Sequence, residues 1–283
     1  MQVECLVKAH NLLGECPLWC EETSSLYWVD IEDKKFYCFN TLLGTSQYYT
    51  FPLKIGSFCL APNHQIIAAC ENKIYRIHLD NFDSEVMFEV NDQNIRFNDG
   101  KCDRRGRFWV GTTDLNFNSK IASLYRVDNN ITKLREGLIC SNGLDWSPDD
   151  SIFYLTDSGT NTIYSYQYNL EQGSFNNESC FILDSNKTPD GLCVDCDGFI
   201  WSAKWGEGKV IRYDSNGNTE REILLPVKYP TSCAFGGKEM NTLFITSAAM
   251  PIQEKDPYDN SMAGGIFYIK TKTKGLSQTF FAY

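Results

Sequence analysis

The sequence lacks any run of about 18 consecutive apolar residues, so nothing in it predicts a membrane-spanning helix. It also lacks an excess of basic residues, since 26 Lys and Arg stand against 36 Asp and Glu, a formal net charge of −10 at pH 7. That balance argues against nucleic-acid binding and against electrostatic attachment to a membrane, whereas it suits metal cations or neutral substrates. We therefore expect a small molecule as the partner, and neither nucleic acid nor a membrane. We also expect a monomer, although nothing in the sequence determines the oligomeric state.

A secretion signal is not predicted either, because the N-terminus, MQVECLVKAHNLLGECPLW, has no basic start followed by a long apolar core. Cysteine, in contrast, is not scarce, with 12 residues in 283. Half of these lie in strand-like runs, namely Cys59, Cys70, Cys140, Cys180, Cys193 and Cys233. That distribution favours buried free thiols in a reducing compartment, and so a cytoplasmic protein.

What the sequence does contain is a succession of short aromatic and β-branched runs with period-two alternation, such as SLYWVDI, GRFWVGT, SIFYLTDS and GGIFYIK. Polar turns such as EETSS, DRRG, SPDD and DCDG separate these runs. No helical periodicity is sustained for even three turns. The pattern therefore predicts an all-β protein.

One sequence unit recurs six times: a small or acidic residue, a short apolar run, a polar turn and an aromatic-rich run. We call the first residue of each copy its head position, and the six heads are Glu15, Gly56, Asp99, Asn142, Asp190 and Ser232. Their spacings are 41, 43, 43, 48 and 42 residues. Copies of about 45 residues, each with room for four short strands, are typical of a β-propeller. We predict one domain, residues 1–283, forming a six-bladed propeller in which the C-terminal run pairs with the N-terminal strand.

The chemistry of the heads suggests a metal site. In a propeller the first strand of each blade lines a central channel, so Glu15, Asp99, Asn142 and Asp190 are expected to converge, with Asn98 beside Asp99. Carboxylates gathered in a narrow channel repel one another unless a cation neutralises them. Oxygen ligands without thiolate or imidazole suit Ca²⁺, Mg²⁺ or Mn²⁺, and Zn²⁺ through carboxylates. The alternative interpretation is that these polar residues are structural.

The sequence signals for other kinds of catalytic or metal site are weaker. None of the three histidines stands beside a head position, so a Ser-His-Asp triad is not expected. Cys193 and Cys196 form a CxxC pair, but a structural zinc site needs a second pair. No glycine-rich phosphate loop stands between a strand and a helix.

The segments LGECPLW, IRFNDGKCDRRGRFWVGT, CSNGLDWSPDDSIFYLTDS, TPDGLCVDCDGFIWSAKWGEGKVIRYD and TSCAFGGK resemble the family of regucalcin (senescence marker protein). That family includes the gluconolactonases and the firefly luciferin-regenerating enzyme. The matches run in order from about Gly14 to Gly265 and so cover most of the chain. Each segment alone would be a weak signal, but together they are a strong one.

The resemblance implies a six-bladed propeller with a divalent metal in its central channel, which opens sugar lactones to aldonic acids. The cation is expected to be Ca²⁺, with Zn²⁺, Mn²⁺ or Mg²⁺ as alternatives. Carried over residue by residue, the metal ligands are Glu15, Asn142 and Asp190, and Asp190 is also the catalytic acid/base. Arg96 and Asn98 fall on substrate-contacting positions.

One departure concerns a family glutamate that contacts substrate. The ungapped match in this chain is Asn116, and Asp114 is the nearest carboxylate. The choice of lactone is therefore open. Two other functions also stay open: a non-enzymatic calcium-binding regulator of the regucalcin type, and a hydrolase of other esters or organophosphates. Arg96 and Asn98 favour an enzyme, because a pure calcium buffer has no need of them beside the metal.

Overall fold

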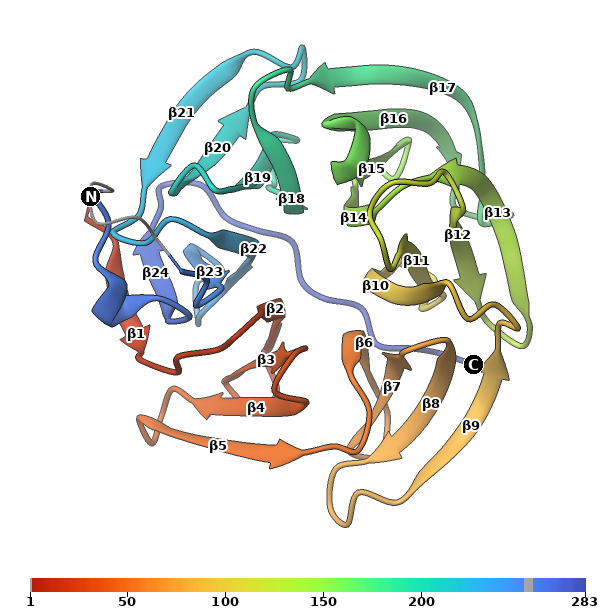
Figure 1. The fold of residues 1–283 in the computed structure, drawn as a ribbon, viewed down its shortest axis with the longest axis horizontal. Coiled ribbons are helices and arrows are strands. Elements are labelled where there is room, and N and C mark those ends of the chain that lie inside the picture. The colour runs from red at the N-terminus through yellow and green to blue at the C-terminus, as the bar shows by residue number, and fades with distance from the viewer. Residues whose placement is uncertain (1, 252–256) are drawn as a thin grey trace. The chain divides into compact units, whose positions relative to one another are not determined.

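The computed structural model describes residues 2–251 and 257–283 of the chain. The described residues form strands β1 to β24 and two short 3₁₀ helices, η1 (Ser158–Thr160) and η2 (Asn260–Met262) (Figure 1). The strands assemble into six four-stranded sheets, in each of which neighbouring strands run antiparallel. We call each sheet a blade. The predicted all-β class with six blades is confirmed, and no helix in the described part is long and apolar enough to cross a membrane.

The chain divides into two compact units. Unit 1 comprises Met1–Pro52 and Asp184–Ser277, and unit 2 comprises Leu53–Leu183 and Gln278–Tyr283. Each unit contains three whole blades. That all 283 residues act as one domain stays a prediction.

The three blades of unit 1 have strands in the following spatial orders. They are β2 (Gly14–Cys20), β3 (Ser25–Asp30), β4 (Lys35–Asn40) and β5 (Thr45–Thr50); β18 (Thr188–Val194), β19 (Ile200–Trp205), β20 (Lys209–Tyr213) and β21 (Thr219–Leu224); and β22 (Pro230–Gly236), β23 (Thr242–Ser247), β24 (Ile266–Lys270) and β1 (Glu4–Val7).

The blades of unit 2 are built in the same way. They are β6 (Ile55–Ala61), β7 (Gln65–Cys70), β8 (Lys73–His78) and β9 (Ser84–Glu89); β10 (Ile95–Cys102), β11 (Phe108–Asp114), β12 (Ala122–Val127) and β13 (Ile131–Leu138); and β14 (Ser141–Trp146), β15 (Ile152–Asp157), β16 (Thr162–Asn169) and β17 (Ser174–Leu183).

The two ends of the chain are held in different ways. Strand β1 pairs with β24, so the N-terminal strand and the C-terminal run share one blade, as predicted. The last residues then join unit 2, where the backbone N–H of Phe281 donates to the carbonyl of Leu60 at 2.7 Å. The Phe281 side chain is buried among the hydrophobic residues of β6, β10 and β11. The C-terminal tail is therefore part of a core.

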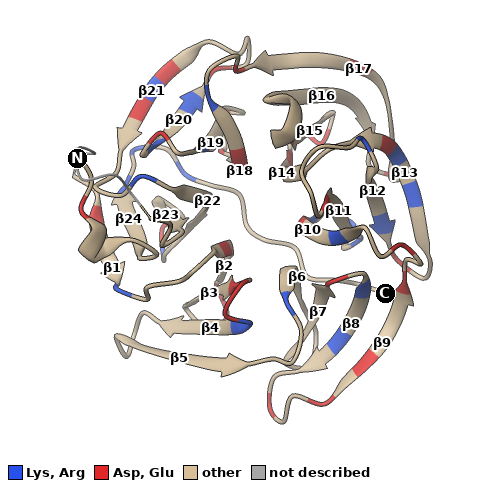
Figure 2. Cartoon of the chain, in the orientation of Figure 1, with Lys and Arg blue, Asp and Glu red and all other residues tan. Residues whose placement is uncertain are grey.

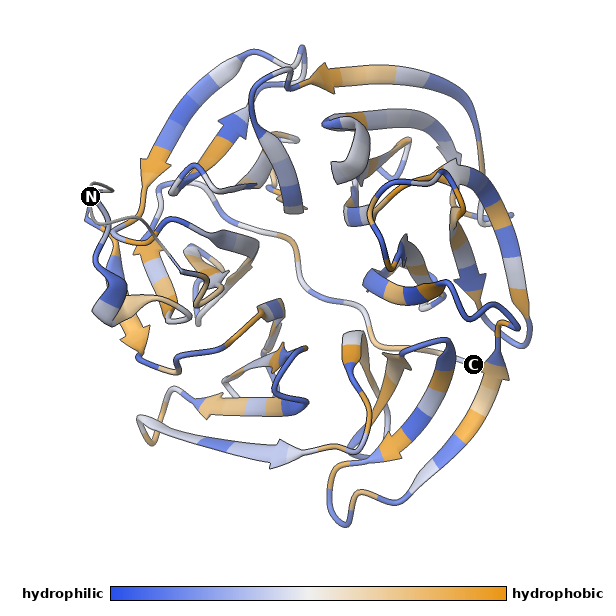
Figure 3. Cartoon of the chain, viewed as in Figure 1, coloured by the Kyte–Doolittle hydropathy of each residue, from blue (hydrophilic) through white to orange (hydrophobic). Residues whose placement is uncertain are grey.

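Burial follows the order of the strands within a blade. All of β6 is buried, whereas most of β9, the fourth strand of the same blade, is exposed. The fourth strands β9, β13 and β21 carry many of the charged residues (Figure 2), and β13 and β21 are mostly hydrophilic (Figure 3). The aromatic and β-branched residues that predicted the strands fill the inner layers, where burial of apolar surface stabilises the fold.

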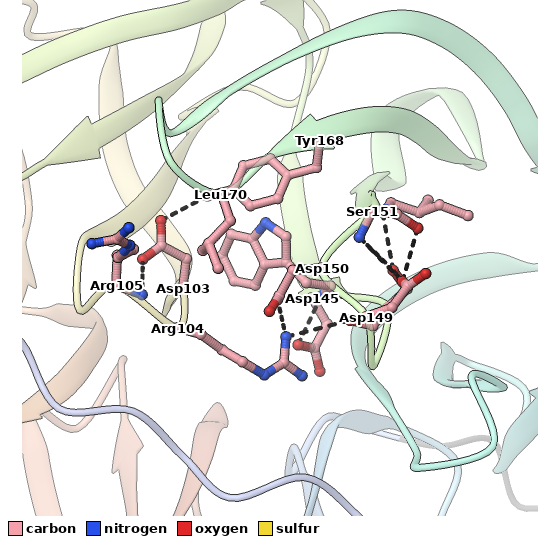
Figure 4. A network of polar contacts seen from close by, with 12 residues as sticks. Asp103, Arg104, Arg105, Asp145, Asp149, Asp150, Ser151, Tyr168 and Leu170 are labelled. Atoms are coloured by element: carbon pink, nitrogen blue, oxygen red, sulfur yellow. Dashed lines mark hydrogen bonds and ion pairs between the residues drawn. The ribbon is translucent and has the colours of Figure 1, made fainter.

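The turn 103-DRRG-106 shows how a polar loop is tied to the core. The carboxylate of Asp103 accepts hydrogen bonds from the Trp109 indole at 2.9 Å, from Arg107 Nε at 2.6 Å and from the Tyr168 hydroxyl at 2.7 Å. Gly106 has a φ of 75°, which is the left-handed region that favours glycine. The surrounding polar network, which includes Asp103 and Tyr168, links this turn to the neighbouring blade (Figure 4).

Unit 1 repeats the same construction at 195-DCDG-198. The Asp195 carboxylate accepts from the Trp201 indole at 2.8 Å and from Arg212 Nε at 2.9 Å. Gly198, at the position equivalent to Gly106, has a φ of 80°. The recurrence of Asp, Gly and Trp at the same intervals is therefore a structural signature of the blade.

The cysteines are all free, as predicted. Five of the six named above are buried, but Cys180 is exposed, so the prediction of burial was wrong for it. Cys180 lies on β17, the fourth strand of its blade, and most of that strand faces solvent.

Candidate active site

The first strand of every blade is bulged near its head position. In β18 the pairing with β19 shifts between Pro189 and Leu192, which leaves Asp190 outside the ladder. In β14 the corresponding shift leaves Asn142 outside the ladder. A bulge bends the strand and redirects side chains, and bulges are frequent beside active sites. The other four shifts lie at Glu15/Leu18, Ile55/Ser57, Phe97/Gly100 and Pro230/Cys233.

The register of these bulges shifts three head positions by one residue. In β2 the unpaired residues are Cys16 and Pro17, which follow the paired Glu15, and in β22 they are Thr231 and Ser232. In β10 the pairing is interrupted between Phe97 and Gly100, so two residues, Asn98 and Asp99, lie outside the ladder. The first of the two unpaired residues is Asn142 in β14 and Asp190 in β18. Asn98, not Asp99, is therefore equivalent to these two residues. The sequence repeat misplaced the Asp99 head by one residue because it aligned the DG dipeptides instead of the strand pairing.

Arg96 and Asn98 are brought together in unit 2, as predicted for two substrate-contacting residues. Arg96 Nη1 donates to Asn98 Oδ1 at 2.7 Å and to the carbonyl of Phe97 at 3.0 Å. Asn98 Nδ2 donates in turn to the carbonyl of Ser141 at 2.9 Å. Arg96 is half-buried and Asn98 is buried. The guanidinium is thus held by neutral oxygens, and its remaining N–H groups suit hydroxyl or carbonyl oxygens.

Asn142 lies close to the same pair. Asn98 Nδ2 and Asn142 Nδ2 both point to the Cys140 sulfur, at 3.8 Å and 3.9 Å. Asn142 Nδ2 also donates to the Ser158 hydroxyl at 3.0 Å, which orients the amide. Its Oδ1 atom is buried and accepts no hydrogen bond from the described residues. A buried carbonyl oxygen without a donor is costly unless a cation or water meets it, so Asn142 Oδ1 suits a hard metal ion.

Asp99 occupies the second bulge residue of β10 and is buried. Burial raises the pKa of its carboxyl to about 7, although the positive charges of Arg96 and Lys101 act in the opposite direction. A carboxyl that titrates near neutral pH can both take up and release a proton there. Burial and a raised pKa together make Asp99 a candidate acid/base group.

In unit 1, Glu15 is buried at the start of the bulge in β2. Its Oε2 atom accepts from the backbone N–H of Cys16 at 3.1 Å. The segment that leads into β2 is anchored by Asp30 at the end of β3, whose carboxylate accepts from the N–H groups of Leu12 at 2.7 Å and Leu13 at 3.0 Å. In unit 2, Asp157 at the end of β15 anchors the segment that leads into β14 in the same manner, since its carboxylate accepts from the backbone N–H of Cys140 at 3.0 Å.

Asp30, Asp157 and Ser158 are residues that the sequence interpretation did not single out. They hold the segments from which Glu15 and Asn142 project, so they position the candidate ligands. A signal was present, because an aspartate ends the second strand in both SLYWVD and IFYLTD.

Asp190 is buried and lies beside an unusual lysine. Lys204 pairs in register with Pro189 and is fully buried. Its ammonium lies 2.6 Å from the Asp184 carboxylate and 4.9 Å from the centre of the Tyr213 ring. Burial lowers the Lys204 pKa to about 8, against the opposing effect of Asp184. The strand of Asp190 therefore lies next to a buried charge network.

Asn116 is exposed in the loop after β11. Asp114, the carboxylate nearest in sequence, accepts from the backbone N–H groups of Asn116 at 3.1 Å, Asn118 at 3.0 Å and Ser119 at 2.8 Å. These bonds lower the Asp114 pKa and commit its carboxylate to the loop. Of the two residues, Asn116 is the one whose side chain is available to a substrate, and its substrate contact stays a prediction.

The predicted metal ligands, Glu15, Asn142 and Asp190, belong to both units. The described residues contain no group of three or more His, Cys, Asp or Glu side chains placed to hold a metal ion. The predicted set has only two carboxylates, and its third donor is an amide oxygen. Carboxylate and amide oxygens are the donors that Ca²⁺ and Mg²⁺ take, so the residue types fit such a cation.

The fold and these residues define a class: an all-β six-bladed propeller with buried oxygen donors at the bulges of its first strands. A family model described as "SMP-30/Gluconolactonase/LRE-like region" matches residues 13–249. The chain therefore belongs to the SMP-30/gluconolactonase/LRE-like family.

Relatives and solved structures agree with this assignment. The chain is 34% identical to "Putative sugar lactone lactonase YvrE" of Bacillus subtilis, over 96% of this chain and 95% of that protein. It is 33% identical to regucalcin of Bos taurus, over 95% and 94% of the two chains. The crystal structure of a regucalcin from Agrobacterium tumefaciens, described as a calcium-binding protein, has a TM-score of 0.93 at 24% identity and covers 99% of this chain and 97% of its own. A luciferin-regenerating enzyme has a TM-score of 0.92 at 23% identity, with 99% of both chains covered, so both structures support the fold.

Proposed function

We propose that this protein is a metal-dependent hydrolase that opens sugar lactones to aldonic acids. The observation that carries the proposal is the buried Asn142 Oδ1, which accepts no hydrogen bond within the described part of the chain. It lies close to Asn98, whose own side-chain oxygen accepts from Arg96. An oxygen that suits a cation thus lies near two groups that suit a polyhydroxylated substrate. Membership of a family that contains gluconolactonases supports the reaction class.

The proposed cofactor is one divalent cation, Ca²⁺ first, with Zn²⁺, Mn²⁺ or Mg²⁺ as alternatives. Glu15, Asn142 and Asp190 would hold it, because they are buried oxygen donors at bulged strands. When bound, such a cation polarises a carbonyl and favours ionisation of water.

The protein's own side chains would supply binding and proton transfer. Arg96 and Asn98 would hydrogen-bond the hydroxyl groups of the sugar and fix the orientation of its ring, which lowers the entropy cost of reaching the transition state. Asp190 would take a proton from the attacking water and return it to the ring oxygen that leaves. Asp99 is the second candidate for this role, because its pKa of about 7 suits proton exchange at neutral pH.

A second candidate function is calcium binding without catalysis. It is favoured by the likeness to regucalcin, and the Agrobacterium tumefaciens relative is described as calcium-binding. The two functions differ in their need for Arg96, which cannot ligate a cation and would have no role in a buffer. Hydrolysis of other esters or of organophosphates on the same scaffold is the remaining alternative.

A cytoplasmic location and a monomeric state are further parts of the proposal. The first rests on twelve free cysteines, since exposed thiols such as those of Cys180 and Cys196 persist best in a reducing compartment.

The test is a pH-stat assay of purified protein against a panel of aldonolactones. Samples are stripped with a chelator and then supplied separately with Ca²⁺, Zn²⁺, Mn²⁺ or Mg²⁺. We expect acid release that requires a cation and that is restored by at least one of the four. Tight calcium binding without hydrolysis of any lactone or ester would support the regulator instead.

A further inference from the structure

Side-chain hydrogen bonds join the bulges of neighbouring first strands within unit 2. Ser57 Oγ of β6 donates to the carbonyl of Asn98 in β10. Asn98 Nδ2 donates in turn to the carbonyl of Ser141 in β14 at 2.9 Å. Ser141 directly precedes the candidate ligand Asn142. A side chain at the bulge of one blade therefore holds the backbone from which the candidate ligand of the next blade projects.

Unit 1 contains the same arrangement with a different residue type. The first of the two residues outside the ladder is Thr231 in β22, the position that Asn98 occupies in β10. Thr231 Oγ1 donates to the carbonyl of Gly14 in β2 at 2.5 Å. Gly14 directly precedes the candidate ligand Glu15. In both units, therefore, the first bulge residue of one blade binds the carbonyl before a candidate ligand of the next.

The hydrogen bonds around Thr231 have a fixed direction. Its hydroxyl must be the donor to Gly14, because a carbonyl oxygen has no hydrogen to give. That bond uses its single hydrogen, so the Thr246 hydroxyl, 2.8 Å away, donates to Thr231 Oγ1. Thr246 lies opposite the bulge in β23, and its Oγ1 accepts from the backbone N–H of Ser232 at 3.2 Å. Both threonines are fully buried, so the chain of hydrogen bonds is shielded from water.

The segment before Glu15 is restrained from two sides. Within its own blade, Asp30 accepts from the backbone N–H groups of Leu12 and Leu13, as described above. From the neighbouring blade, the restraint is the bond from Thr231 to Gly14. Because Glu15 is buried and follows Gly14 directly, a shift of that carbonyl would move the carboxylate with it.

The bulge of β22 also contacts the strand that carries Asp190. Strand β22 packs against both β2 and β18 (Figure 1). Gly191, the residue after Asp190, has no room for a Cβ atom because Ser232 Oγ occupies that space. Residues 231–232 therefore touch the backbone beside both candidate ligands of unit 1.

We propose that Thr231 is a positioning residue that holds Glu15 in place for a divalent cation, through the carbonyl of Gly14. The inference rests on the proposed function, because it takes Glu15 as a metal ligand. Threonine suits this task, since its branched side chain has few χ1 rotamers and its hydroxyl donates and accepts at the same time. Groups that orient metal ligands from behind change metal affinity by about 10–100-fold when they are removed.

The experiment measures cation affinity by calorimetry on chelator-stripped protein, with Ca²⁺, Mg²⁺, Mn²⁺ and Zn²⁺ added separately. Thr231→Val removes the hydroxyl but keeps the branched shape, and we expect it to raise the dissociation constant about 10-fold or more. Thr231→Ser keeps the hydroxyl and should bind nearly as tightly as wild type. Should Thr231→Val fail to fold, Thr231→Cys takes its place, because a thiol is a weaker donor of similar size, and it should bind more weakly than Thr231→Ser.

Thr242→Val is the matched control. Thr242 is a buried threonine of the same blade, but it pairs with Gly236 at the opposite end of β22 from the bulge. Its hydroxyl accepts from the Lys270 ammonium at 2.7 Å. The control therefore loses a hydrogen-bonding hydroxyl far from Glu15 and should bind cations as wild type does.

Thermal unfolding separates positioning from general stabilisation. A cation that binds the folded protein raises its Tm by an amount that depends on its affinity. If Thr231 only stabilised the fold, Thr231→Val would lower the Tm equally with chelator and with cation. We expect instead that the difference between these two Tm values shrinks in Thr231→Val and is retained in Thr231→Ser and Thr242→Val.

The outcomes distinguish this inference from the function on which it rests. A Thr231→Val protein that binds cations as tightly as wild type would overturn the inference, and so would a Thr231→Ser protein that binds as weakly as Thr231→Val. Cation binding with the expected ranking of variants, but without hydrolysis of any lactone, would support the inference and overturn the proposed hydrolase. No binding of any of the four cations by wild type would overturn both.

Discussion

Replacing Lys204 by methionine removes a positive charge from the interior of unit 1. Lys204 is fully buried, its ammonium lies 2.6 Å from Asp184, and the Tyr213 hydroxyl donates to the same carboxylate at 3.1 Å. Methionine keeps the length of the side chain and its contact with the Tyr213 ring. The variant therefore tests the charge and not the packing.

The magnitude follows from the partner that is left behind. Breaking a buried ion pair by removing one member costs about 3–5 kcal/mol, because the other charge stays buried. The Asp184 side chain retains 11% exposure and the Tyr213 hydrogen bond, so we expect the lower end, about 3 kcal/mol. For a chain of this size that corresponds to a fall in Tm of roughly 6 °C.

The double variant Lys204→Met with Asp184→Asn removes both charges and should recover most of the lost stability. Lys209→Met is the matched control, because Lys209 pairs with Glu222 at 3.1 Å near the surface, where such a pair contributes about 0–1 kcal/mol. The assay is thermal and urea unfolding followed by circular dichroism. A Lys204→Met protein as stable as wild type, or a double variant no better than the single one, would refute the reasoning.

Three further predictions concern the candidate site. Asp190→Asn should still bind metal at raised metal concentration but turn over about 10²-fold more slowly, since an amide can coordinate a cation but cannot accept a proton. If saturating metal restored full activity, Asp190 would be a metal ligand and not the proton carrier. Arg96→Ala should raise KM or lower kcat with metal affinity unchanged within about twofold, measured by calorimetry, because Arg96 is held by neutral oxygens; loss of the metal would point to a structural role. The pKa of Asp99 in the folded protein is raised to about 7, so wild type should lose stability as the pH rises from about 4 to about 7. Asp99→Asn has no such carboxyl and should therefore be more stable than wild type above pH 7. Tm measured against pH for both proteins tests this, and equal Tm values at every pH would contradict it. If the activity of Asp99→Asn also lacked a step near pH 7 that wild type shows, Asp99 would be the proton carrier.

Part of the site was predictable from local sequence. The recurrence of head residues placed Glu15, Asn142 and Asp190 on the first strands of their blades, and the structure confirms those strands and buries all three residues. That they converge on one metal stays a prediction. The Asp99 head was one residue off, because a bulge is defined by pairing with the next strand and no single strand encodes it. The role of Asp114 was likewise hidden, because its partners are backbone N–H groups that every residue possesses.

The sequence by itself determined the class of fold. Three patterns indicated it: period-two alternation, the Asp-x-x-Gly turns, and six copies of one unit at nearly equal spacing. Each pattern is visible along the chain itself, so no long-range contact has to be known. Only the tertiary structure decided which polar groups lie together and which are buried. Examples are the burial of Lys204, the exposure of Cys180 and the hydrogen bond from Asn98 to Ser141. Each depends on neighbours that are distant in sequence, and so do the ionisation and hydrogen bonding of these side chains.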